Sequence, residues 1–178
     1  PEDVRRRLVS ASIDLAAESG PHAVTVEAVA RRAGVSKGGF QHHFPTRRAL
    51  LDAVFDEIWG QFQGQIESYI QRDDDPTGRI TRAYVHTNED AATEEMRRLS
   101  RASLALLMSD ADMRRAWAER TARLVPDESA DPDARMRLLI CRLASDGLWL
   151  ADLLGLHDLS GELRAELMRR LDDMTRRT

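Results

Sequence analysis

Residues 36–43 contain the groups whose chemistry is most distinctive in this chain. Ser36 precedes Lys37, and a serine hydroxyl directly before a helix is a typical N-cap. A lysine beside the free backbone amides of a helix start suits a phosphate or a similar anion. Gly38 and Gly39 carry no side chain that would keep another molecule from the backbone. The segment therefore predicts a small anion-contacting surface at the start of a helix.

The residues on either side of this segment predict two short helices joined by a tight turn. Thr25 is a typical N-cap for the first, and Gly34 ends it because glycine readily adopts the left-handed conformation of such a turn. The second covers residues 37–43, and Pro45 precedes a long helix over residues 47–70. Apolar side chains within this unit predict a small core: Val29, Val35, Phe40 and Phe44.

Helical periodicity extends over the rest of the chain, which predicts an all-α fold. An amphipathic helix is expected over residues 2–19, and others over 79–87, 133–154 and 161–176. Softer breaks divide the stretch between the second and third of these into further helices. No strand alternation, internal repeat or low-complexity segment is present in the sequence.

Charge and composition narrow the possible functions. The first fifty residues carry eight Lys or Arg against five Asp or Glu, whereas the remainder carries eighteen against twenty-five. A basic segment joined to an acidic remainder suits a protein that binds a polyanion. Cys141 is the single cysteine, so no intramolecular disulfide can form, and no apolar run approaches the roughly 20 residues that span a bilayer. We expect a cytoplasmic protein.

The sequence resembles the DNA-binding signature of the TetR family over about fifty residues. The matching pattern runs from Thr25 through Gly34, Ser36 and Gly38 to His43-Phe44-Pro45-Thr46-Arg47 and Leu50-Leu51. It requires small, apolar and capping residues at more than a dozen fixed positions, so chance agreement is improbable. The resemblance implies an N-terminal three-helix helix-turn-helix domain followed by a helical ligand-binding and dimerisation domain.

The resemblance implies that residues 37–43 enter the major groove of DNA. Gln41 suits an adenine edge, and His42 suits a base or a phosphate, so these two are candidates for sequence readout. Phosphate or backbone contacts are expected from Thr25, Ser36, Lys37, Gly38, Gly39, His43 and Arg47. Many family members have tyrosine at the position of Gln41, so operator preference cannot be transferred. His43 has an alternative role as a structural cap, and a metal site at the two adjacent histidines is not expected.

The predicted domain boundary follows residue 46, with residues 47–178 forming the second domain and 47–70 connecting the two. Family resemblance implies that the last two helices pair with a twofold mate, and dimers of this kind read pseudo-palindromes with half-sites about 34 Å apart. The predicted interface comprises Leu143, Ala144, Gly147, Ala151, Leu163, Leu167 and Leu171. The alternative for each of these residues is packing inside the chain.

A looser resemblance to multidrug-responsive repressors of the family implies a pocket with aromatic walls. Its predicted lining is Phe62, Leu104, Met108, Trp117 and Trp149, with Asp146 placed to neutralise a cationic ligand. The alternative for these residues is packing in the ordinary core, because the chain has only nine aromatic residues. For Asp146 the alternative is a hydrogen bond between helices.

The predicted function is thus sequence-specific regulation of transcription, with repression relieved by a small apolar or cationic aromatic inducer. No nucleophile with its base, metal set or phosphate-binding glycine loop occurs at useful spacing, so neither an enzyme nor a cofactor is expected. A helical protein-interaction module is the main alternative function, because amphipathic helices alone would look similar outside residues 25–51. Activation remains an alternative to repression, because the same DNA-binding head serves both.

Overall fold

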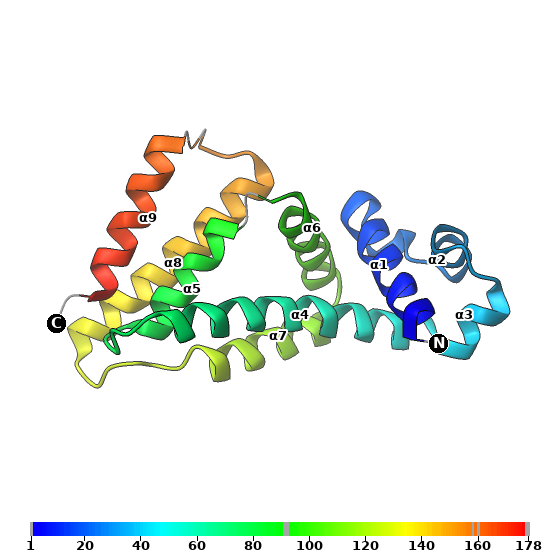
Figure 1. The fold of residues 1–178 in the computed structure, drawn as a ribbon, viewed down its shortest axis with the longest axis horizontal. Helices are drawn as coiled ribbons and strands as arrows, with labels where there is room; N and C mark the ends of the chain where they lie inside the picture. The colour runs from blue at the N-terminus through cyan, green and yellow to red at the C-terminus, as the bar shows by residue number, and fades with distance from the viewer. Residues whose placement is uncertain (1, 91–92, 158, 160, 177–178) are drawn as a thin grey trace. The chain divides into compact units, whose positions relative to one another are not determined.

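The computed structural model describes residues 2–90, 93–157, 159 and 161–176. Within these residues the regular elements are all helices, as the sequence predicts (Figure 1). They are α1 (Glu2–Ser19), the 3-10 turn η1 (Pro21–Ala23), α2 (Val26–Ala33), α3 (Lys37–His43), α4 (Arg47–Arg72), α5 (Arg79–Asp90), α6 (Glu94–Ser109), α7 (Ala111–Leu124), α8 (Pro132–Leu154) and α9 (Gly161–Arg176).

Local capping residues set the ends of the two short helices. The hydroxyl of Thr25 accepts the amide of Ala28 at 3.2 Å, which caps the start of α2. Gly34 ends α2 with a φ of +67°, in the left-handed region. The hydroxyl of Ser36 accepts the amide of Gly39 at 3.1 Å and starts α3. These ends confirm the predicted turn between α2 and α3.

The sequence predicts that a helix ends at residue 87, before a softer break over residues 88–93, but α5 continues to Asp90 and includes Asn88. The side-chain amide of Asn88 is 2.6 Å from the hydroxyl of Ser145 on α8, and the residue is almost completely buried. A polar residue whose hydrogen bonds are made inside the protein does not need to end a helix. The rest of the predicted break, at residues 91 and 92, lies outside the described residues.

The chain forms two compact units, and each is described by itself. Unit 1 comprises residues 1–61 and 94–118, and unit 2 comprises residues 62–93 and 119–178. Unit 1 therefore contains the helix-turn-helix, the first part of α4, and α6. This compact unit thus includes α6, which is distant in sequence from its other parts.

Unit 1 is organised around one apolar core that includes residues of the helix-turn-helix. Leu8 from α1, Phe40 from α3 and Leu50 from α4 are each at most 1% exposed. Leu99 and Leu106 of α6 belong to the same core. The predicted core residues Val29, Phe40 and Phe44 are buried in it, and Val35 packs at its edge. This shared core fixes α2 and α3 to α1.

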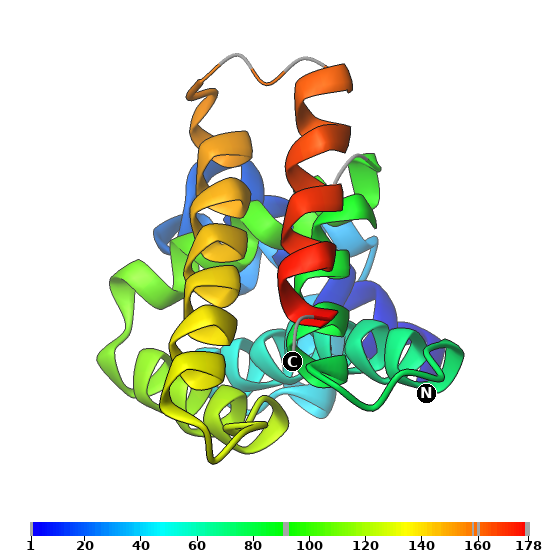
Figure 2. The same cartoon turned by 90° about the vertical axis from the view of Figure 1, so that its left-hand side faces the viewer.

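In unit 2, α8 and α9 lie side by side and α5 packs against both (Figure 2). Val85, Cys141 and Leu171 bring the three helices into one apolar cluster. The guanidinium of Arg82 is almost completely buried and contacts Asp73 at 2.6 Å and Thr175 at 3.0 Å. It thereby ties the segment before α5 to the end of α9.

None of the described helices is both long enough and apolar enough to cross a membrane.

Candidate DNA-binding surface and ligand residues

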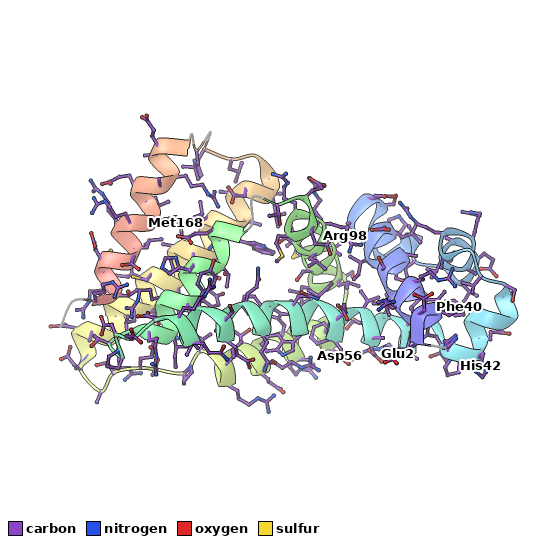
Figure 3. All side chains as sticks on the ribbon, in the orientation of Figure 1. Glu2, Phe40, His42, Asp56, Arg98 and Met168 are labelled. Carbon is purple, nitrogen blue, oxygen red and sulfur yellow. The ribbon has the colours of Figure 1, made fainter. Side chains whose placement is uncertain are left out.

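Helix α3 separates its side chains into a buried and an exposed side. Phe40 is 1% exposed and packs against Phe44, with ring centroids 6.1 Å apart. Lys37, Gln41 and His42 are exposed, and Figure 3 shows His42 and Phe40 on different sides of α3. The predicted readout residues therefore lie together on the solvent side of a helix that is anchored by its aromatic side.

Lys37 forms an ion pair within the helix-turn-helix. Its Nζ atom is 3.1 Å from the Oε1 atom of Glu27 on α2, and both side chains are about two-thirds exposed. The pKa of Glu27 is lowered by its own backbone amide and then by Lys37. An exposed pair of this kind is weak in water, so the ammonium can exchange its carboxylate partner for a phosphate.

Neither the backbone conformation nor the packing around position 38 requires a glycine there. Its φ is not in the left-handed region, and a Cβ atom there would meet only the hydroxyl of Ser36, at 4.0 Å. A Cβ atom on Gly39 would meet the same hydroxyl at 3.4 Å and Val35 at 3.5 Å. The space above Gly38 is therefore free for the close approach of another molecule.

The remaining predicted phosphate contacts have different surroundings. Thr25 and Ser36 are exposed, and their hydroxyls cap α2 and α3. His43 is half-buried, and its ring stands edge-on to that of His42 at 5.2 Å. Arg47 donates from Nε to the carbonyl of Val24 at 2.7 Å and from a terminal nitrogen to the carbonyl of Pro21. Two of its donors are thus engaged by the backbone before α2.

Three of the predicted ligand residues lie in unit 1. Trp117 on α7 stands edge-on to Trp59 on α4, with ring centroids 5.2 Å apart. It also stands edge-on to Phe55, with ring centroids 6.1 Å apart. Leu104 is half-buried, whereas Met108 is 73% exposed. The aromatic cluster around Trp117 therefore includes two rings of α4 that the sequence pattern did not indicate.

The other three predicted ligand residues, Phe62, Asp146 and Trp149, lie in unit 2. Asp146 accepts a hydrogen bond from the hydroxyl of Tyr84, whose ring stands edge-on to Phe62 at 5.8 Å. Desolvation raises the pKa of Asp146, and the Tyr84 hydroxyl opposes this shift. Burial is also the main cause that raises the pKa of Tyr84, followed by the charge of Asp146. The structure thus contains the alternative given for Asp146, a hydrogen bond between helices, which here joins α8 to α5.

Described residues of unit 1 line a cavity of about 350 Å³ and another of about 400 Å³. None of the predicted ligand residues lines either of them. The smaller is lined by Pro21, His22, Arg47, Leu51, Leu106, Ser109, Asp110 and Met113. The larger is lined by Glu2, Arg5, Arg6, Val9, Ser10, Ile13, Glu57, Gln61, Glu95, Arg98 and Leu99.

The predicted interface residues divide into exposed and buried groups. Leu143 is 60% exposed, Leu163 is 54% exposed, and Gly147 is also exposed. Ala151 and Leu171 are buried inside unit 2. The other two, Ala144 and Leu167, are half-buried against the apolar cluster of α5, α8 and α9.

Two family models match the chain. Residues 8–54 match the family described as bacterial regulatory proteins of the tetR family. Residues 78–176, more than half of the chain, match the tetracyclin repressor-like C-terminal domain. The chain belongs to the TetR family. The members of this family are transcription factors rather than enzymes.

Curated relatives of this TetR-family chain resemble it in a limited segment. The HTH-type transcriptional regulator BetI of Klebsiella pneumoniae is 39% identical over 62 residues, which are 35% of this chain and 32% of BetI. BetI of Escherichia coli K12 is 37% identical over a segment of the same length. The match thus covers about a third of the length of these relatives.

Solved structures share the whole TetR fold at low sequence identity. A transcriptional regulator from Rhodococcus sp. Rha1 has a TM-score of 0.71 and 23% identity, over 96% of this chain and 95% of that protein. The multidrug binding protein EbrR, complexed with malachite green, has a TM-score of 0.68 and 20% identity, over 94% and 96% of the two chains. These similarities support the fold.

Two contacts in this TetR-family protein were not predicted from the sequence. Tyr84 was not among the candidates, although it contacts the predicted residues Phe62 and Asp146. Glu27 was not among the predicted residues either, although it pairs with Lys37. The partners lie 62 and 10 residues apart in the chain, so spacing gave no signal for either contact.

Proposed function

We propose that this TetR-family regulator is a repressor that binds a palindromic operator as a homodimer and is released by a small ligand. The solvent side of α3 carries this proposal. Gln41 and His42 are exposed beside Lys37, while Phe40 anchors the opposite side in the core. A helix presented in this way has free side chains for base edges and a positive charge for the phosphates next to them.

The exposed apolar residues of α8 support a homodimer. Large apolar side chains of this helix remain exposed in the single chain: Met136, Leu139, Ile140, Leu143, Leu150 and Leu154. Leu139 apart, they follow one another at steps of three, four or seven residues, which place them on one side of a helix. Gly147 lies within this series and is exposed, so the backbone of a second helix can approach there. A monomeric soluble protein rarely leaves so long an apolar stripe in water, and a twofold partner would cover it.

The surroundings of Asp146 support an aromatic cation as the inducer. Its carboxylate accepts a hydrogen bond from Tyr84, and the ring of Tyr84 stands edge-on to that of Phe62. A carboxylate beside aromatic rings attracts a cation both by its charge and through the ring faces. Desolvation raises the pKa of Asp146, and a bound cation would offset that cost. The similar structure of EbrR is described with malachite green and with ethidium.

A selection from random DNA duplexes tests the DNA-reading part of the proposal. Purified protein should enrich a symmetric motif with half-sites about one helical turn apart. Gln41→Ala should change the preference at one base pair of each half-site by roughly 1–3 kcal/mol. Recovery of an asymmetric motif would contradict the dimeric reader, and unchanged preference in Gln41→Ala would remove that residue from base readout.

A matched pair of ligands tests the inducer class. Tetraphenylphosphonium is a bulky aromatic cation that cannot intercalate, and triphenylphosphine oxide is a neutral aromatic compound for comparison. The cation should weaken binding to the enriched duplex more strongly than the neutral compound. Asp146→Asn should reduce this difference while the affinity for DNA stays unchanged. Equal effects of both compounds on the original protein would contradict a role for the carboxylate in selecting cations.

A further inference from the structure

Arg47 lies at the N-terminus of a helix, which is an unfavourable position for a positively charged side chain. It is the first residue of α4, directly after Thr46, whose hydroxyl caps the helix by accepting the amide of Ala49 at 3.0 Å. The N-terminus of a helix carries a partial positive charge and therefore repels a guanidinium. A side chain at this position is stabilised only if it finds acceptors away from its own helix.

The structure provides those acceptors in the segment before α2. The Nε atom of Arg47 donates to the carbonyl of Val24 at 2.7 Å, and a terminal nitrogen donates to the carbonyl of Pro21. Val24 is completely buried, so this end of the segment is fixed in the core of unit 1. The planar guanidinium thus connects the start of α4 with two carbonyls that lie 23 and 26 residues earlier in the chain.

This contact bears on the DNA-binding surface because Thr25 follows Val24 directly. Thr25 caps α2, and the turn at Gly34 leads from α2 into α3, where the amide of Val35 donates to the carbonyl of Ala30 at 2.9 Å. The position of the Val24 carbonyl therefore determines where α2 begins, and α2 in turn determines the direction of α3.

A second arginine holds the other end of α2. A terminal nitrogen of Arg7 on α1 donates to the carbonyl of Ala33 at 3.2 Å, in the last turn of α2. The helix before the recognition helix is thus held at its start from α4 and at its end from α1. Both contacts use backbone carbonyls, so they fix the main chain and not the rotamer of a side chain.

We infer that Arg47 is a positioning residue for DNA recognition, which holds α2 and α3 in their reading orientation through the carbonyls of Pro21 and Val24. This assignment differs from the phosphate contact that the family resemblance implies for the residue. The two roles predict different effects of salt and of a conservative substitution. A phosphate contact depends on charge, which lysine retains, whereas the positioning contact depends on the fork of the guanidinium, which lysine lacks.

The experiment compares Arg47→Lys and Arg47→Ala with Lys37→Ala, each at a temperature where the protein is fully folded. Affinities for the enriched duplex and for a scrambled duplex are measured over a range of salt concentrations. Both Arg47 variants should bind the enriched duplex about tenfold more weakly, with a smaller loss for the scrambled duplex. Their slope of log affinity against log salt should match that of the original protein. In Lys37→Ala the slope should become shallower by about 0.9.

Hydrogen exchange of the backbone amides provides a readout that needs no DNA. In both Arg47 variants the amides of residues 24–29 should exchange faster, because the start of α2 loses its attachment to α4. Arg48→Ala is the matched control, since it removes the neighbouring charge from α4 without touching either carbonyl. If the original protein enriches no motif, the proposed operator is wrong, and the exchange data still decide whether Arg47 holds α2.

Two results would overturn the inference. A shallower salt slope in Arg47→Ala that Arg47→Lys restores would make Arg47 a phosphate contact. The second result is faster exchange in both variants while the preference for the enriched over the scrambled duplex stays unchanged. It would show that Arg47 stabilises the start of α2 without affecting DNA recognition.

Discussion

The carboxylate of Asp14 on α1 lies 2.6 Å from the guanidinium of Arg98 on α6. Its other oxygen lies 3.7 Å from Arg32 on α2, which also forms two short hydrogen bonds to Glu18. Asp14 therefore stands between a helix of the helix-turn-helix and α6, within unit 1. Both arginines carry further partners, so the carboxylate is part of a network and not of an isolated surface pair.

Asp14→Asn should lower the free energy of unfolding by about 1 kcal/mol, because an amide of the same shape loses the charge-assisted contact to Arg98. Urea titration at low and high salt measures this change. Asp112→Asn is the control, because Asp112 pairs with Arg115 while both side chains are more than 65% exposed, and it should have little effect. An equal loss in the two variants would show that the network around Asp14 adds nothing to a surface pair.

Gly78 should be far less tolerant of substitution than Gly155. Both residues have a left-handed φ, of +62° and +66°, so alanine is strained at each by about 1 kcal/mol. At Gly78 a Cβ atom would also collide with the carbonyl oxygen of Thr175, whereas at Gly155 nothing lies within 4 Å. We expect Gly78→Ala to destabilise the protein by about 3 kcal/mol and Gly155→Ala by about 1 kcal/mol. Thermal unfolding of the two variants provides the comparison, and similar losses would contradict the close approach of α9 to Gly78.

The stability contribution of Asp146 should depend on pH. Desolvation raises the pKa of its carboxylate in the folded protein, so ionisation of this group opposes folding. The stabilising effect of the neutral acid is complete below the ordinary carboxyl pKa and is lost as the pH rises through the raised value. Asp146→Asn should therefore be more stable than the original protein at pH 7, by up to about 1 kcal/mol because solvent screens the group. The difference should disappear near pH 3, measured by urea unfolding at each pH.

Tyr84→Phe tests the partner of the same hydrogen bond. Removing the hydroxyl leaves the carboxylate of Asp146 without the donor that stabilises its charged form, so the pKa of Asp146 should rise further. This variant should be less stable than the original protein at pH 7 by about 1–2 kcal/mol, and the deficit should decrease toward pH 3. In the double variant with Asp146→Asn the loss from Tyr84→Phe should be smaller. Additive effects would show that the two residues are not coupled.

The sequence predicted the parts of the fold that depend on neighbouring residues. Thr25, Gly34 and Ser36 each act on amides or carbonyls within five residues, so their effect on α2 and α3 follows from local rules. The partners of Arg47 and Asp146 lie 23 or more residues away and are brought near only by the fold. A long polar side chain can be recognised as functional from a pattern, but its partner is decided by tertiary structure.

The residues of α8 illustrate the same limit for apolar side chains. The helix is apolar on more than one side, so its pattern predicts that several sides are covered without indicating which side faces the core. The structure buries Ala151 and leaves Leu143 60% exposed, although both were predicted at one interface. Leu171 on α9 is buried as well. The exposed residues of the predicted set are the ones to test in a dimer.

Leu143→Arg should convert the proposed dimer into a monomer. An arginine at this position would carry a charge into the proposed apolar interface, and removing that charge from water is costly. Met108→Arg is the matched control, because Met108 is also an exposed large apolar residue but belongs to unit 1, whereas α8 belongs to unit 2. Light scattering should give the mass of a dimer for the original protein and the control, and half that mass for Leu143→Arg.

The affinity for the enriched duplex should fall by at least about a hundredfold in Leu143→Arg, since one recognition helix makes too few contacts for tight binding. A dimer that persists in Leu143→Arg would place the interface elsewhere, and monomers that keep full affinity would show that operator binding does not depend on it.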